Sequence, residues 1–507
     1  MSVFLWPLVE ESNFFHVKRF YTCGREALVS MLFNSIVFFV FLGVVLPVFY
    51  GLKKSEHKKI WLLAASYIFY GYWDWRFCSL LLFSSLVDYW VGLKLYAEPN
   101  QTKRKRWLQL SLVVNLGLLA TFKYFNFFID SFQSMLDGFG FSADFLHLNI
   151  LLPVGISFYT FQTLSYTIDI YRKRIESTRD FLSFALFVSF FPQLVAGPIE
   201  RAKTLLPQLE KLKAPTAKMI KDGVSLIVLG LFKKVMIGDT AGRYADHIFN
   251  DMGIYPSAEV VVGLLLFTIQ IYADFSGYSH IARGVAKLLG IELMKNFNQP
   301  YFSRNITEFW HRWHISLSTW LRDYLYISIG GNRKGNNRTY VNLLITMLLG
   351  GLWHGASWNF VIWGGLHGIY LLVHRFWLKG KKVEEENYVF SWATFPKTVM
   401  NVGFTFLLVS FTWLFFRATT FQDTMLFISK LQYWEPSEFK WPYLKIAFSF
   451  LSVTFLFDFF EYKTGKHAFV NVIENKAVRY GILASLFSVS LVYILQAKSA
   501  PFLYFQF

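Results

Sequence analysis

The chain has 507 residues, of which 54% are hydrophobic, 20% are aromatic and only 16% are charged. This composition excludes an ordinary soluble globular protein, and apolar runs of about 18 to 22 residues favour membrane-spanning helices over the short alternating strands of a β-barrel. The formal net charge of +17 does not indicate nucleic-acid binding, because the Lys and Arg residues are concentrated in short loops between apolar runs, where the positive-inside rule explains them.

The N-terminal segment, residues 1–30, mixes charged and apolar residues and lacks the organisation of a signal peptide. The run MLFNSIVFFVFLGVVLPVFYGL, which begins at Met31, is predicted to be a complete first span. We therefore expect Met31 to be the natural start and residues 1–30 to be an upstream extension. Residues 31–507 are then predicted to form a single transmembrane domain. The two cysteines, Cys23 and Cys78, support neither a disulfide framework nor a metal cluster.

The loops that follow alternate in charge. KKSEHKK (Lys53 to Lys59), QTKRKRW (Gln101 to Trp107) and YRKRIESTRD (Tyr171 to Asp180) are each separated by two spans, so all three are predicted to be cytoplasmic. The alternation breaks after the short apolar run Phe181 to Val195, because the basic AGPIERAKTLLPQLEKLK follows it where simple counting expects an outside loop. This break predicts a re-entrant segment, whose backbone must be satisfied by protein or by a water-filled cavity.

Further spans are predicted at about 220–237, 257–276, 340–353, 359–377, 399–416, 443–460 and 478–496. Between the second and third of these lies a basic and aromatic stretch, residues 278–338. Its apolar residues recur at spacings of three and four, which predicts one amphipathic helix on the cytoplasmic side. These are Phe309, Trp313, Leu317, Trp320, Leu321 and Tyr324. The GGNRKGNNR that follows is predicted to be a loop rich in donors for phosphate.

One titratable side chain, His354, lies in the apolar stretch LLGGLWHGASWNF (Leu348 to Phe360). Ionisable groups inside membrane spans are costly and are functional hypotheses by default. An imidazole near its ordinary pKa of about 6.5 can take a proton from an attacking hydroxyl at neutral pH. Gly350, Gly351, Gly355 and Ala356 are expected to leave backbone space for a ligand. Two interpretations remain open from these residues: a base acting on a bound hydroxyl, and a structural histidine hydrogen-bonded between helices.

The other histidines support fewer hypotheses. His311 and His314 would share a face of the predicted helix, but no Cys, Asp or Glu at suitable spacing completes a zinc site. His367, in GGLHG, is predicted to pack or to position other groups. A Ser-His-Asp hydrolase using Ser357 is excluded, because no strand-turn-helix setting for the nucleophile is present.

The stretches NFNQPYFSRNITEFWHRWHISLSTWLRDYLYISIGGNRKG and LLGGLWHGASWNFVIWGGLHG closely resemble the membrane-bound O-acyltransferase (MBOAT) family, in particular its bacterial alginate O-acetyltransferase-like branch. The resemblance extends to MLFNSIVFFVFL, FFPQLVAGPIERAKTLLPQL and PFLYFQF, so it covers the chain from Met31 onward. The sequence departs from this branch at His311, where arginine is commoner, and in its 30-residue extension.

The resemblance implies an all-α polytopic bundle of about 11 to 13 transmembrane and re-entrant helices around a central tunnel. It places the family's essential histidine at His354 and its second motif histidine at His314. The implied reaction moves an acetyl group from a cytoplasmic thioester, with acetyl-CoA as the expected donor, to a cell-envelope polysaccharide. The implied setting is the bacterial inner membrane, with a periplasmic acetyltransferase of SGNH-hydrolase type as partner. No bound cofactor, metal or nucleic acid is expected.

The remaining candidate site residues are expected to bind the substrates of this reaction. Basic side chains are available for the donor's phosphates, and other residues near His354 are expected to contact or position substrate. The basic residues are Arg304, Arg322, Arg333, Lys334 and Arg338, and the others are Trp353, Trp358 and Asn359.

The C-terminal PFLYFQF is predicted to emerge on the outside, with Tyr504 at the outer mouth of the tunnel. Tyr504 is a candidate acyl carrier or partner contact, and an aromatic anchor at the membrane interface is its alternative role. Two other functions stay open at this stage: a transporter or flippase for a lipid-linked saccharide, and a scaffolding subunit. The identity of the polymer, whether alginate, peptidoglycan, cellulose or another polysaccharide, is not specified by the sequence.

Overall fold

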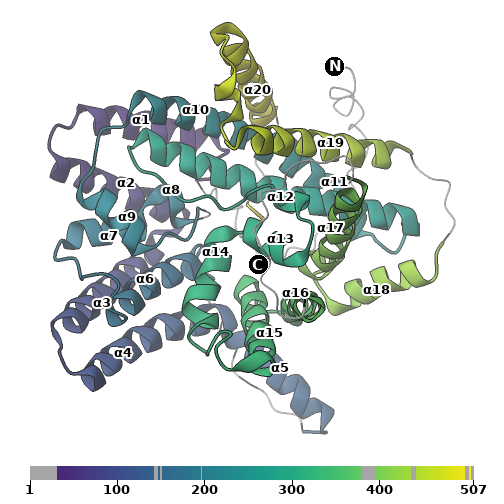
Figure 1. Cartoon of the computed structure of the whole chain (residues 1–507), viewed down its shortest axis with the longest axis horizontal. Coiled ribbons are helices and arrows are strands. Elements are labelled where there is room, and N and C mark those ends of the chain that lie inside the picture. Colours follow the sequence, from purple (N-terminus) through teal and green to yellow (C-terminus); the bar gives the residue numbers. More distant parts are fainter. Residues whose placement is uncertain are drawn as a thin grey trace. The chain divides into compact units, whose positions relative to one another are not determined.

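A computed structural model of the chain describes residues 31–141, 145, 147–148, 151–195, 197–378, 395–435, 441–496 and 502–503. The predicted extension at residues 1–30 and the candidate residue Tyr504 lie outside this described part. Within it, the regular elements are all helices and no strand occurs, as the all-α prediction requires (Figure 1).

Among the residues that the structure describes, the first half of the chain forms twelve α-helices with short irregular elements between some of them. The α-helices are α1 (Ile36–Gly51), α2 (Ser55–Asp74), α3 (Cys78–Ala97), α4 (Gln101–Leu119), α5 (Phe125–Gly138), α6 (Ile156–Tyr171), α7 (Phe181–Ser189), α8 (Phe191–Leu194), α9 (Ala202–Glu210), α10 (Ala217–Leu231), α11 (Thr240–Asn250) and α12 (Ser257–Leu288). The irregular elements are η2 (Trp75–Phe77) and the π-helices η3 (Ala120–Tyr124) and η4 (Phe232–Asp239).

The described residues of the second half form eight more α-helices, among them the two that flank His354. They are α13 (Ile306–Arg312), α14 (Ile315–Trp320), α15 (Gly335–His354), α16 (Trp358–Trp377), α17 (Phe395–Arg417), α18 (Phe421–Gln432), α19 (Trp441–Thr464) and α20 (Lys476–Gln496). The shorter elements are η5 (Pro300–Phe302), the π-helix η6 (Leu321–Tyr326) and η7 (Phe469–Val472).

In the described part, six helical runs are long and apolar enough to cross a membrane. They are Ser55–Ala97, Gln101–Gly138, Ser257–Leu288, Phe395–Arg417, Tyr443–Thr464 and Lys476–Gln496. Four of the seven later spans predicted from the sequence fall in these runs, namely 257–276, 399–416, 443–460 and 478–496, and α12 continues beyond its predicted end to Leu288. The predicted spans 220–237, 340–353 and 359–377 are helical but are not among the six, and the predicted first span forms α1, a shorter apolar helix of 16 residues. The chain is therefore a multi-pass membrane protein. The central tunnel stays a prediction.

Helix α12 lies at the centre of the bundle and is buried along almost its whole length (Figure 1). It packs against α10, α11, α17 and α19. Glycines allow the closest of these approaches, because a Cβ atom at Gly230 of α10 would lie 2.6 Å from the carbonyl oxygen of Gly277 on α12. Small residues at such crossings allow membrane helices to pack with their backbones in contact.

The segment predicted to be re-entrant forms two short helices, α7 and α8, of nine and four residues. Neither reaches the roughly 20 residues that a span needs. The C-terminal end of α7 is satisfied from within the protein, since the side-chain amide of Gln193 on α8 donates to the carbonyl oxygen of Phe187 on α7 at 2.9 Å. The chain turns back at Gly197, where a Cβ would lie 2.3 Å from Gln193 Cα.

The prediction of a single amphipathic helix over ITEFWHRWHISLSTWLRDYLYI (Ile306 to Ile327) is wrong. The structure divides it into α13, α14 and η6, with a break at Trp313 and His314. The predicted apolar face is nevertheless confirmed, because all six of its residues are buried. The basic stretch 278–338 also begins inside α12 rather than after it. Periodicity identified the buried face but did not reveal where the backbone breaks.

Candidate active site

His354 is the last residue of α15 and is buried, with 4% of its surface exposed. The helix ends there because Gly355 is extended, and α16 begins after Ser357, whose hydroxyl accepts a hydrogen bond from the backbone N–H of Asn359 at 3.2 Å. The imidazole packs edge-on against the rings of Trp363 and Phe416, at centroid distances of 5.0 and 5.3 Å. A tight α15–α16 turn thus places the ring inside an aromatic cluster.

The glycines around His354 serve helix packing, which corrects the expectation that they leave space for a ligand. A Cβ on Gly351 would lie 2.2 Å from the carbonyl oxygen of Phe360, and one on Gly355 would lie 2.1 Å from the Phe360 ring. A Cβ on Gly364 of α16 would lie 2.3 Å from the carbonyl oxygen of Met347. Glycine is required on both helices because their backbones touch.

The C-terminal end of α15 is held by two residues of the π-helix η3. The ammonium group of Lys123 donates to the carbonyl oxygens of Trp353 and His354, at 2.8 and 2.9 Å. The hydroxyl of Tyr124 donates to the carbonyl oxygen of Leu352 at 2.9 Å. A cation at a helix C-terminus satisfies the last carbonyl groups and complements the helix dipole. Lys123 therefore fixes the backbone that carries His354.

His314 lies close to His354, and their ring centroids are 6.3 Å apart. It has no measurable exposure and occupies the break between α13 and α14 with a φ of 41°, a left-handed conformation that costs a non-glycine residue about 1–3 kcal/mol. Backbone hydrogen bonds hold both sides of the break, from Asn298 N to Arg312 O at 3.0 Å and from Ile315 N to Asn296 O at 2.8 Å. Because backbone strain concentrates at functional sites, His314 is a candidate site residue.

His311 does not join this pair, because its side chain is exposed whereas His314 is buried. The two side chains therefore do not lie together as ligands of one zinc ion would. His367 is fully buried and its Nε2 lies 2.9 Å from the hydroxyl of Thr412, as expected for a residue that packs between helices.

Trp353 lies between the two site histidines, with its ring 5.0 Å from His354 and 6.0 Å from His314. Its indole N–H is buried and has no hydrogen-bond partner among the described residues, and the same holds for Trp313 and Trp363. Buried donors without partners are rare in native proteins and usually indicate an ordered water or a ligand.

Two other residues expected near the substrate are engaged elsewhere. The Trp358 side chain is 59% exposed and its ring contacts Phe127 at 5.6 Å. The side-chain amide of Asn359 donates to the carbonyl oxygens of Ala418 and Thr420, at 3.0 and 3.2 Å. Asn359 thus links α16 to the turn between α17 and α18.

The basic residues expected to bind phosphate lie on several elements, and their role in binding stays a prediction. Arg304 pairs with Glu308 at 3.0 Å, in a group that also includes Arg312. Arg322 is exposed and pairs with Asp323 at 2.7 Å. Arg333, Lys334 and Arg338 are exposed around the start of α15.

Of the C-terminal PFLYFQF, the structure describes Phe502 and Leu503, which lie inside the protein, and the predicted place of Tyr504 at the outer mouth of the tunnel is outside the described residues. Both residues are buried, and the backbone N–H of Leu503 donates to Asp274 on α12 at 2.8 Å. The Phe502 ring packs on Phe275 at 5.4 Å, and Phe275 in turn contacts His314 at 4.6 Å. The residues directly before Tyr504 are therefore one ring away from the histidine pair.

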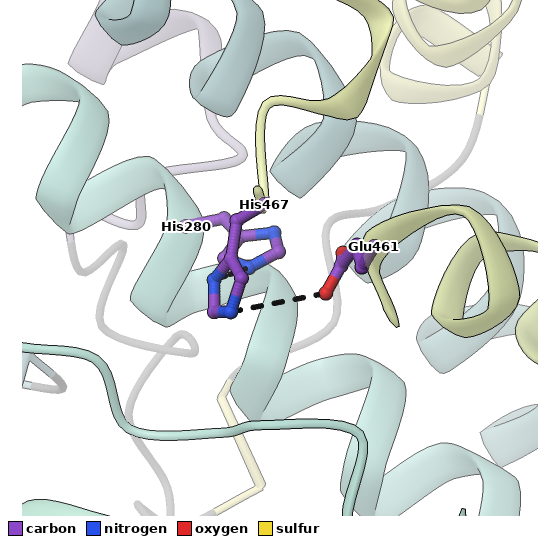
Figure 2. A group of neighbouring side chains, drawn as sticks. All are labelled: His280, Glu461 and His467. Carbon is purple, nitrogen blue, oxygen red and sulfur yellow. Dashed lines mark hydrogen bonds and ion pairs between the residues drawn. The ribbon is translucent and has the colours of Figure 1, made fainter. Parts of the chain in front are cut away.

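A second buried cluster joins His280 of α12, Glu461 of α19 and His467, which follows α19 (Figure 2). His280 Nε2 lies 2.9 Å from His467 Nδ1, and His467 Nε2 lies 3.9 Å from a carboxylate oxygen of Glu461. These are ligand types that bind zinc, so we tested the cluster for its fit to a metal ion.

The surroundings of this cluster do not suit a cation. The guanidinium of Arg283 donates to His467 Nδ1 at 2.8 Å, and the ammonium of Lys233 donates to Glu461 at 2.6 Å. Burial, together with Arg283 and other nearby cations, lowers the pKa of His467 well below its ordinary value. His467 Nδ1 and the Glu461 carboxylate already accept hydrogen bonds from cationic side chains, so we interpret the cluster as a hydrogen-bonded brace between α12 and α19.

The family model for membrane-bound O-acyltransferases matches residues 62–382, more than half of the chain, including both site histidines. The chain belongs to this family. It is therefore an enzyme, a membrane-embedded O-acyltransferase, and the transporter alternative is not favoured.

Several relatives from the family align with most of the chain. It is 39% identical over 502 residues to a probable alginate O-acetylase of Pseudomonas putida, covering 94% of this chain and 100% of the relative. It is 44% identical over 392 residues to a probable alginate O-acetylase of Azotobacter vinelandii, covering 76% of this chain and 75% of the relative. It is 37% identical over 427 residues to the peptidoglycan O-acetyltransferase of Helicobacter pylori, covering 78% of both chains.

Proposed function

We propose that this O-acyltransferase takes an acetyl group from a cytoplasmic thioester, with acetyl-CoA as donor, and passes it on for O-acetylation of a cell-envelope polysaccharide. The observation that carries the proposal is the buried pair of His314 and His354, with centroids 6.3 Å apart beside an unpartnered indole N–H. The names of the relatives from Pseudomonas putida and Helicobacter pylori support the acetyl group and the class of acceptor.

In the proposed reaction, His354 accepts the proton of the acceptor hydroxyl as its oxygen attacks the thioester carbonyl. The C–O bond forms, the C–S bond breaks, and the imidazolium returns the proton to the leaving thiolate. Lys123 holds the α15 terminus at His354, and His314 and Trp353 act on the carbonyl oxygen as negative charge develops there. General base catalysis contributes roughly 10²- to 10⁴-fold, and each donor to the oxyanion contributes a comparable factor.

The setting we propose is the bacterial inner membrane, with a periplasmic acetyltransferase of SGNH-hydrolase type as partner. Tyr504 is our candidate for the acyl carrier or partner contact, because it follows directly on a buried segment near His314. Mass spectrometry of the C-terminal peptide should then find an acetyl-tyrosine in strains that lack the partner. Full activity of Tyr504→Phe would exclude the covalent role.

A deletion strain tests the acceptor and the enzyme together. The O-acetyl content of each envelope polymer is measured in the deletion strain, and we expect it to fall in one polymer only. Complementation with the unaltered chain should restore the acetyl content of that polymer. Complementation with His354→Ala, expressed at the same level, should not. Alginate and peptidoglycan are the polymers to measure first, because the relatives carry those names. Unchanged acetylation of every polymer in the deletion strain would contradict the proposal.

A further inference from the structure

Two arginines lie over one tyrosine ring where α6, α9 and η6 meet. The guanidinium carbons of Arg172 and Arg201 are 5.5 and 5.1 Å from the centroid of the Tyr324 ring. Arg172 follows α6, in a loop predicted to be cytoplasmic, and Arg201 precedes α9, in the basic segment after the predicted re-entrant run. The three side chains define what we name the Arg–Tyr–Arg site.

Neither guanidinium of this site forms an ion pair with a carboxylate in the described part of the chain. Arg172 donates to the carbonyl oxygen of Asp323 at 2.9 Å and to the hydroxyl of Ser328 at 2.6 Å. Arg201 donates to the hydroxyl of Thr319 at 3.2 Å and more weakly to a carbonyl oxygen at 3.4 Å. These acceptors are all uncharged.

The carboxylates nearby are already engaged. Asp169 accepts the hydroxyl of Tyr324 at 2.7 Å and pairs with Arg174 at 3.5 Å, while the Asp323 carboxylate pairs with Arg322 at 2.7 Å. Burial lowers the pKa of Arg201, and the neighbouring carboxylates of Asp323, Asp169 and Glu200 only partly offset that effect. Because neither guanidinium contacts a carboxylate directly, both retain N–H donors that an incoming anion can use.

A column of aromatic rings leads from this site to the histidine pair. Tyr324 contacts Trp320 at 5.1 Å, and Trp320 stacks on Phe161 at 3.8 Å. Phe161 contacts Trp353 at 5.5 Å, and Trp353 contacts His354 at 5.0 Å. These rings belong to a hydrophobic cluster separate from the main core. This cluster therefore connects the Arg–Tyr–Arg site with the histidine pair.

We propose that the Arg–Tyr–Arg site binds the phosphate group of a phosphopantetheine arm, whose thioester then lies along the aromatic column toward His354. The proposal rests on the proposed function, because it names where the anionic part of the acyl donor is held. Arginine forms two parallel hydrogen bonds with a phosphate, and the rings of the column suit the narrow, uncharged pantetheine chain. Coenzyme A and acyl carrier proteins share this arm.

Binding to the purified chain in neutral detergent tests the proposal. The probes are coenzyme A, 4′-phosphopantetheine and pantetheine, and the variants are Arg172→Gln, Arg201→Gln and Arg201→Lys. We expect Arg201→Gln to weaken binding of the two phosphorylated probes by about 10- to 100-fold, the loss typical of charged hydrogen bonds. Arg201→Lys should lose less, and pantetheine binding should stay the same in every variant.

Arg106→Gln is the matched control, because Arg106 is an exposed arginine at the cytoplasmic start of α4. It should bind all probes like the unaltered chain. Equal coenzyme A affinity in Arg201→Gln, Arg172→Gln and the unaltered chain would overturn the site, as would an unaltered chain that binds none of the phosphorylated probes. If vesicles of phosphatidylglycerol displaced coenzyme A only when Arg201 is present, the phosphate would come from a lipid headgroup and the donor assignment would be wrong.

Kinetics separate this proposal from the proposed function. In acetyl transfer from acetyl-CoA, Arg201→Gln should raise KM while changing kcat little, and His354→Ala should mainly lower kcat. A loss of transfer in His354→Ala together with unchanged KM in Arg201→Gln would reject the phosphate site and leave the acyltransfer function standing. No transfer from any pantetheine thioester by the unaltered chain would reject both.

Discussion

The imidazoles of His314 and His354 lie 6.3 Å apart because a helix end and a helix break meet. His354 ends α15, and His314 occupies the left-handed position between α13 and α14. The pair therefore depends on two backbone features as well as on two side chains. Substitutions can separate the backbone requirement from the chemical one.

At His314 the structure predicts different results for different replacements. Asn tolerates the left-handed conformation, so His314→Asn should fold with a melting temperature near that of the unaltered chain and lose about 10- to 100-fold in transfer. His314→Val should lower the melting temperature as well, because a β-branched residue is strained there. Thermal unfolding in detergent and acetyl transfer should be measured on the same samples. Full activity in His314→Asn would show that the imidazole is dispensable.

Gly351→Ala should destabilise the protein, because its Cβ would lie 2.2 Å from the carbonyl oxygen of Phe360. Overpacking of this kind costs roughly 1–3 kcal/mol, which outweighs the gain of up to about 1 kcal/mol from replacing a helical glycine. Gly365→Ala on α16 is the matched control, since its Cβ would make an ordinary 3.4 Å contact with Leu348. The melting temperature should fall in the first variant and hold or rise in the second. Equal melting temperatures would contradict the close α15–α16 packing.

Lys123→Met should lower the rate of acetyl transfer about tenfold or more, because the carbonyl oxygens of Trp353 and His354 lose their shared donor. Lys123→Arg keeps the charge and should retain more activity. The apparent affinity for the acyl donor should change little, since Lys123 touches the helix end and not the Arg–Tyr–Arg site. A variant with unchanged kcat and a raised KM would assign Lys123 to donor binding instead.

Removal of one charge from the brace between α12 and α19 should strongly lower the free energy of unfolding. Lys233→Met leaves the Glu461 carboxylate without its 2.6 Å partner and should cost roughly 3–5 kcal/mol. The double variant Lys233→Met/Glu461→Gln should recover part of that loss. Elemental analysis of the purified chain should find no stoichiometric zinc. One equivalent of metal that disappears in His467→Ala would show that this cluster is a metal site after all.

Stability should depend on pH through Glu200, which lies between α8 and α9. Burial raises the pKa of its carboxyl to about 7, above the ordinary value of 4.5. Between these pH values the folded state holds a proton that the unfolded state has released, so this group's contribution to stability falls as pH rises toward 7. Glu200→Gln should therefore raise the melting temperature at pH 8 more than at pH 5. An equal effect at both pH values would contradict the raised pKa.

The sequence was sufficient to predict most of the helices and the buried aromatic face, and the structure places the two motif histidines, His354 and His314, side by side. Their chemical roles stay predictions. The predicted features follow from apolar run length, helical periodicity and recognisable motifs. The break at His314 could not be predicted, because no glycine or proline marks it and tertiary hydrogen bonds to Asn296 and Asn298 hold it. The glycines near His354 were misinterpreted, since a lone sequence does not distinguish space for a ligand from contact with a neighbouring helix.

Lys123 was missed although a usable signal was present. It is an ionisable residue inside the apolar run GLLATFKYFNFF, which is the same criterion that singled out His354. The Arg–Tyr–Arg site had no such signal, because its three residues come from distant segments and only the fold brings them together.

Single-turnover transfer of labelled acetyl groups from acetyl-CoA, by the purified chain in proteoliposomes, tests the central claim most directly. His354→Gln should transfer roughly 10²- to 10⁴-fold more slowly than the unaltered chain, with the same melting temperature and the same affinity for coenzyme A. A rate within twofold of the unaltered chain, at equal protein and equal binding, would contradict the assignment of His354 as the base.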